Sequence, residues 1–102
     1  MSQTRRKELV ALATKHDFLV LSDEPYNFLC FDDGNGGTKP PLPLALEPGA
    51  RSHVLSLGSF SKILAPGLRV GWIQGDPQLL ERAWWSSGVI RSGGALNPIG
   101  VS

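Results

Sequence analysis

VLSLGSFSKILAPGLRVGWI, residues Val54 to Ile73, is the segment from which most of the fold can be predicted. Its first four residues are mostly apolar and predict a strand, and the glycine-led turn Gly58–Lys62 follows directly. After the short segment LAPG, Leu68–Ile73 predicts a further strand. So short a connection favours an antiparallel pair, because a parallel pairing needs a long crossover. The turn and the start of the second strand are then expected at the same edge of a sheet.

Four more segments surround this pair. Gln3–Lys15 has apolar residues at helical spacing and predicts an amphipathic helix, and the apolar run Phe18–Leu21 is typical of a strand covered on both faces, ending near Ser22. Asp32–Ala50 is rich in glycine and proline and predicts a loop excursion outside the core, while Pro77 opens a second helix that reaches about Ser86. The order predicts an α/β fold with about three strands of a mostly parallel sheet and flanking helices.

Composition narrows the class of protein. A chain of 102 residues allows one domain at most, and its Lys+Arg count of 10 against an Asp+Glu count of 9 leaves no basic field for nucleic acid. Cys30 is the single cysteine, so we expect no intramolecular disulfide and no metal site. The N-terminal apolar stretch is too short for a membrane span and lacks a cleavage pattern. These features favour a cytoplasmic location, with a mitochondrial one open for a longer form.

Polar side chains follow the ends of the predicted strands. They are Asp23 and Tyr26 after the first strand, Ser59, Ser61 and Lys62 after the second, and Arg69 at the start of the third. If the first two strands are parallel and the third is antiparallel, all six lie at the edge where open α/β sheets bind ligands. Hydroxyl groups, turn N–H groups and a guanidinium suit a phosphate, and a lysine amine at the same edge can attack an aldehyde.

Two motifs carry a family resemblance. DEPY, Asp23 to Tyr26, and SFSKILAPGLRVGW, Ser59 to Trp72, resemble the fold-type I pyridoxal-phosphate aminotransferases of class I/II, nearest the branch of 2-aminoadipate and kynurenine aminotransferases. The resemblance covers nearly the whole chain. It implies that residues 1–102 are a fragment of the large domain that binds the cofactor.

The resemblance also implies a role for each strand-end residue. Lys62, Asp23 and Tyr26 would be catalytic: the lysine forms the Schiff base with pyridoxal 5'-phosphate, the aspartate pairs with the ring nitrogen, and the tyrosine with the 3-oxygen. The two serines and Arg69 would hold the phosphate. The implied reaction moves an amino group between an amino acid and a 2-oxo acid, in a protein expected to be a homodimer at full length.

The chain departs from the family in length. Members are several times longer, and the upstream glycine-rich phosphate turn, the Asn-Pro-x-Gly element and the domain with the substrate-carboxylate arginine have no counterpart in this sequence. Arg91 is interpreted as a solvated charge and Glu24 as a structural or solvated one. The alternatives left open are a lyase or decarboxylase on the same scaffold, and a truncated fragment that is inactive or binds a partner. We expect the isolated chain to be inactive.

Overall fold

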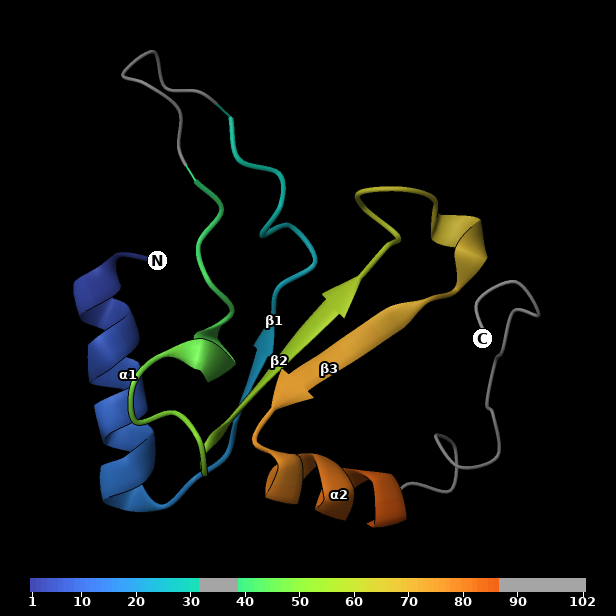
Figure 1. The fold of residues 1–102 in the computed structure, drawn as a ribbon. Helices are drawn as coiled ribbons and strands as arrows, with labels where there is room; N and C mark the ends of the chain where they lie inside the picture. The colour runs from blue at the N-terminus through green and yellow to red at the C-terminus, as the bar shows by residue number, and fades with distance from the viewer. Residues whose placement is uncertain (32–38, 87–102) are drawn as a thin grey trace.

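A mixed three-stranded sheet organises the protein (Figure 1). The computed structural model describes residues 1–31 and 39–86. Strand β1 (Val20–Asp23) pairs in parallel with β2 (Val54–Ser59), and β3 (Gly71–Gly75) pairs antiparallel with the other side of β2. The expected α/β class and the antiparallel third strand are confirmed. Within the described residues the sheet therefore contains one parallel and one antiparallel pair.

The third strand begins later than the sequence predicts. Leu68 was expected to start it, but Leu68 ends the short 3-10 helix η2 (Pro66–Leu68), and Arg69 follows in the left-handed region at φ 51°. A left-handed residue cannot continue an extended strand. β3 consequently starts at Gly71.

Helix α1 (Gln3–His16) has clear caps at both ends. The Ser2 side chain accepts a hydrogen bond from the N–H of Arg5 at 3.4 Å, as an N-cap serine does. At the other end, Asp17 adopts the left-handed conformation and its N–H donates to the carbonyl of Ala13. The helix extends one residue beyond the predicted Lys15.

The first strand also begins later than predicted. Phe18 donates its N–H to the last turn of the helix, at Ala13, and with Leu19 it forms an exposed link, so that pairing starts at Val20. The apolar run was expected to be covered on both faces, yet Leu21 is 60% exposed. That face of β1 therefore remains largely open to solvent at Leu21.

The buried core lies between α1, the beginning of the sheet and the 3-10 helix η1 (Leu44–Leu46), which Figure 1 shows between α1 and β2. Its cluster consists of Val10, Leu44, Ala45, Ala50 and Val54. Three of these belong to the segment expected to stay outside the core, so that expectation is wrong. The glycines and prolines of the segment mark its turns, but the run LALEPGA between them supplies apolar side chains that the sheet buries.

Helix α2 (Pro77–Ser86) follows β3 and buries none of its residues. The Asp76 carboxylate caps its start by accepting the N–H of Gln78 at 3.0 Å. Trp84 and Trp85 are both exposed, and so is Ile73 on the strand before it. No helix among the described residues is long and apolar enough to cross a membrane. Arg91 lies outside the described residues.

Candidate active site

The carboxyl ends of β1 and β2 and the beginning of β3 share one edge of the sheet. Asp23, the last residue of β1, pairs with Leu57, and Ser59, the last residue of β2, pairs with Gly71, the first of β3. The topology required for the predicted site is therefore present. It brings the backbone positions of the DEPY turn, the SFSK turn and Arg69 to the same edge.

The SFSK turn places two hydroxyl groups side by side. The Oγ of Ser59 accepts the N–H of Ser61 at 3.0 Å and donates to the Oγ of Ser61 at 2.9 Å. The N–H of Phe60 donates to Val70 at 3.1 Å, which ties the turn to the start of β3. Both serines are half-buried. Such a pair of hydroxyls on a turn is suited to hold an anion.

Lys62 lies on a single helical turn that follows the serines. The N–H groups of Ile63, Leu64 and Ala65 all donate to the carbonyl of Phe60, at 3.3, 2.9 and 3.1 Å. This turn fixes the backbone at Lys62 and leaves the side chain exposed. The structure thus presents a primary amine to solvent next to the hydroxyl pair.

Arg69 reaches the edge through its unusual backbone. Its left-handed conformation ends η2, and its Nη1 donates to the carbonyl of Pro66 at 3.3 Å. The rest of the guanidinium remains exposed, with donors available to a phosphate.

Asp23 and Tyr26 flank a tight turn at the end of β1. Both side chains are exposed, and the N–H of Leu29 donates to the carbonyl of Tyr26 at 2.9 Å. Between them, Glu24 has the structural role that was one of its two interpretations. Its carboxylate accepts the N–H of Leu44, a residue 20 positions away. No local pattern in the sequence signals that contact.

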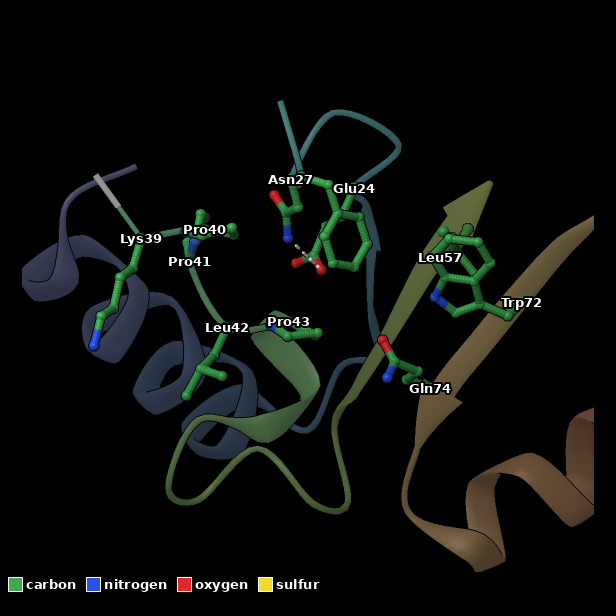
Figure 2. A pocket seen from close by; sticks show the side chains of 12 residues that line it. Glu24, Asn27, Lys39, Pro40, Pro41, Leu42, Pro43, Leu57, Trp72 and Gln74 are labelled. Carbon is green, nitrogen blue, oxygen red and sulfur yellow. Dashed lines mark hydrogen bonds between the residues drawn. The ribbon is translucent and has the colours of Figure 1, made fainter. Parts of the chain in front are cut away.

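A cavity of about 320 Å³ opens beside this edge, between the DEPY turn, the segment of prolines after Lys39, and strands β2 and β3 (Figure 2). Leu57 and Trp72 form its apolar wall, and Glu24 and Gln74 supply polar groups. None of the six predicted site residues lines it. The cavity and the predicted cofactor contacts are therefore neighbouring features rather than one site.

Trp72 anchors the strand ends. Its ring lies over Gly58, where a Cβ atom would come within 2.1 Å of the indole, and it meets Phe60 edge-on with ring centroids 5.0 Å apart. The ring centroid of Phe28, two residues after the DEPY motif, lies 6.3 Å from the ring centroid of Trp72. Only glycine at position 58 allows the indole to come this close to the backbone. Through Phe60 and Phe28, the SFSK turn and the segment after DEPY contact the same tryptophan.

Comparison with known proteins places the chain in a family. Residues 2–89 match the model of the family described as aminotransferase class I and II. The mitochondrial kynurenine/alpha-aminoadipate aminotransferase of Bos taurus is 39% identical over 80% of this chain. That match covers 18% of the bovine protein.

Solved structures agree with this assignment. Pyrococcus horikoshii kynurenine aminotransferase, solved in complex with PMP, superposes with a TM-score of 0.65 at 37% identity, covering 84% of this chain and 20% of that one. LysN, the alpha-aminoadipate aminotransferase of Thermus thermophilus, was solved with N-(5'-phosphopyridoxyl)-L-leucine. It gives a TM-score of 0.64 at 32% identity, over 83% of this chain and 21% of its own. The chain spans about a fifth of the length of these relatives. This 102-residue chain belongs to the class I and II aminotransferase family.

Proposed function

We propose that residues 1–102 are the cofactor-binding segment, within the large domain, of a pyridoxal-phosphate-dependent aminotransferase. The observation that carries the proposal is the shared edge at which β1 and β2 end and β3 begins. The residues on or next to that edge offer an amine, a carboxylate, a phenol, two hydroxyls and a guanidinium. That donor set fits every polar part of pyridoxal phosphate. The family and the pyridoxyl compound in the related LysN structure support the same cofactor.

The phosphate would be held by the SFSK turn and Arg69. The Ser59 and Ser61 hydroxyls are already 2.9 Å apart, so both can turn toward one anion without moving the backbone. Arg69, which ends η2 two residues before β3 begins, adds a permanent positive charge. Together these groups orient the cofactor by its charged end.

The ring would be held by the other three residues. The Asp23 carboxylate keeps a proton on the ring nitrogen, and the Tyr26 hydroxyl donates to the ring oxygen. When bound, pyridoxal phosphate supplies a ring that takes up the negative charge left when the substrate loses a proton. Lys62 Nζ would hold the cofactor and, when released from it, would move the substrate proton as a general base.

The substrates would be an amino acid and a 2-oxo acid, as in the aminotransferases to which the chain is similar. A lyase or decarboxylase would use the same contacts with the cofactor. Measuring whether an added 2-oxo acid becomes an amino acid separates the two reactions. We expect no such turnover from the 102 residues alone, because Lys62, Asp23 and Arg69 are all open to water, which competes for each contact.

Reductive labelling tests the assignment of Lys62. The chain is mixed with pyridoxal phosphate, reduced with borohydride and digested, and the labelled peptides are mapped. Its four lysines, Lys7, Lys15, Lys39 and Lys62, are all exposed, so exposure alone predicts similar labelling. We expect Lys62 to take most of the label at low cofactor concentration.

Two controls test the phosphate contacts. Pyridoxal, which lacks the phosphate, should label the four lysines without preference. Arg69→Ala should weaken the preference for Lys62, and excess pyridoxal phosphate should restore it, because the arginine holds the phosphate and not the ring. Preferential label on Lys15 or Lys39 would overturn the assignment.

A further inference from the structure

Glu24 accepts hydrogen bonds from three different elements. Its Oε1 atom accepts the Ser22 hydroxyl at 2.7 Å and the N–H of Leu44 at 2.9 Å, and its Oε2 atom accepts the side-chain amide of Asn27 at 3.0 Å. Figure 2 shows the contact between Glu24 and Asn27 beside the cavity. Both carboxylate oxygens are thus engaged, and the side chain points back into the fold rather than toward the strand ends.

The backbone at Glu24 is held as firmly as its side chain. Its N–H donates to the carbonyl of Leu57 at 2.8 Å, one residue beyond the last pair of β1, and its carbonyl accepts the N–H of Asn27. Asp23 and Tyr26 lie on either side of this fixed point. The directions in which their side chains leave the chain therefore depend on Glu24.

The η1 segment, which contains the partner Leu44, is itself held in place. The first two N–H groups of η1 have no side-chain cap at Pro43. The N–H of Leu44 donates to Glu24, and the N–H of Ala45 donates to the buried Ser56 hydroxyl at 2.9 Å. Behind η1, Glu47 is buried against Arg6 of α1 at 2.6 Å. Glu24 thus connects the exposed turn to the best-packed part of the molecule.

We propose that Glu24 is a positioning residue, which fixes Asp23 and Tyr26 against the rigid η1 segment so that both can meet the cofactor ring. The inference rests on the proposed function. A carboxylate suits the task because it only accepts hydrogen bonds, and all three of its partners are donors. Charge also strengthens each bond compared with a neutral acceptor.

Hydrogen exchange of the turn tests the proposal without any cofactor. The N–H groups of Asn27 and Leu29 report on the DEPY turn, and the N–H of Leu46, which donates to Pro43, reports on η1. In Glu24→Ala we expect the turn amides to exchange roughly ten-fold faster, since a hydrogen bond to a charged group is lost. Unchanged turn exchange in this variant would overturn the proposal.

Ser56→Ala is the matched control. It removes the other side-chain acceptor of η1 and leaves every contact of Glu24 in place. Its effect should appear at Leu46 and not at Asn27 or Leu29. Equal acceleration of the turn amides in both variants would show that Glu24 only stabilises the fold, and would also overturn the proposal.

A rescue experiment removes the concern that Glu24→Ala unfolds the chain. Asn27→Asp alone places a carboxylate opposite the carboxylate of Glu24, so two acceptors face each other. Adding Glu24→Gln restores one donor and one acceptor, while the introduced glutamine still accepts from Ser22 and Leu44. We expect Asn27→Asp to speed the exchange of the turn amides and the double variant to recover wild-type exchange. Failure of the double variant to improve on Asn27→Asp would count against the proposal.

The cofactor then links the turn to function. Asp23 would keep a proton on the ring nitrogen and Tyr26 would donate to the ring oxygen, and both bound protons would lower the electron density of the ring. Loosening them should raise, by about one unit, the pH midpoint of the visible absorbance of the cofactor attached at Lys62. Glu24→Ala should show this rise, and Ser56→Ala should not. If the wild-type chain takes no label at Lys62, the proposed function fails. If labelling is normal and the midpoint does not move, only the role of Glu24 fails.

Discussion

The two ends of the sheet are held together in different ways. Where the strands β1 and β2 begin, α1 and η1 bury Val10, Leu44 and Val54 in one apolar cluster. Where they end, the site residues are mostly exposed, and backbone hydrogen bonds, the Glu24 contacts and the Trp72 ring fix the turns. The packed core and the predicted cofactor site therefore lie at opposite ends of the strands. Three substitutions probe this separation, in order of decreasing effect.

Leu44→Ala should have the largest effect. Leu44 is 1% exposed and fills the core between η1 and the sheet, so its truncation should lower the free energy of unfolding by about 3 kcal/mol. Leu64→Ala is the control at the opposite end, because Leu64 is 70% exposed and should change stability by less than about 0.5 kcal/mol. Urea denaturation followed by circular dichroism measures both. Similar losses of unfolding free energy in Leu44→Ala and Leu64→Ala would mean that the two ends of the sheet share one core.

Gly58→Ala should have an intermediate effect. The new methyl group would overlap the Trp72 indole, which must move, at a cost of about 2 kcal/mol. Gly67→Ala adds the same methyl group where no atom lies within 4 Å, so it should be nearly neutral. Tryptophan fluorescence should change only in the first variant. A harmless Gly58→Ala would show that the indole does not anchor the strand ends.

The ion pair behind η1 should give a smaller, pH-dependent effect. The hydrogen bond from Arg6 holds the pKa of Glu47 below its ordinary value of 4.5. A lowered folded-state pKa stabilises the fold fully above that ordinary value, and the contribution disappears as the pH falls through the lowered one. The melting temperature should therefore fall in acid, and Glu47→Gln should flatten that dependence. An unchanged acid slope in the variant would exclude Glu47 as its source.

The sequence was sufficient to predict the β2–β3 pair because the connection between these strands is short. The LAPG segment predicted the antiparallel β3, and the register that brings Ser59 opposite Gly71 confirms it. Strand boundaries were less accurate, because left-handed Asp17 and Arg69 depend on local bonds that composition does not reveal. The burial of Leu44 was missed for a related reason: a run between glycines and prolines can be buried only once α1 and the sheet are in place.

The candidate site divides in the same way. The motifs placed six residues at the strand ends, and the topology gathers their backbone positions, but their roles toward the cofactor stay predictions. The cytoplasmic location and the homodimer also stay predictions. The contact of Glu24 with η1 could not be predicted from the sequence, because its partner Leu44 lies 20 positions away along the chain.

The parallel pairing of β1 with β2 has a consequence for the order of folding. Roughly thirty residues between Val20 and Val54 have to be closed into a loop before the first hydrogen bond between β1 and β2 can form. Ser59 and Gly71, in contrast, meet across a short turn. During synthesis, β1 leaves the ribosome before β2, so its backbone N–H and C=O groups stay without their ladder partners until β2 has been made. Of the three strands of the described residues, the one that ends in Asp23 therefore waits longest for its partner.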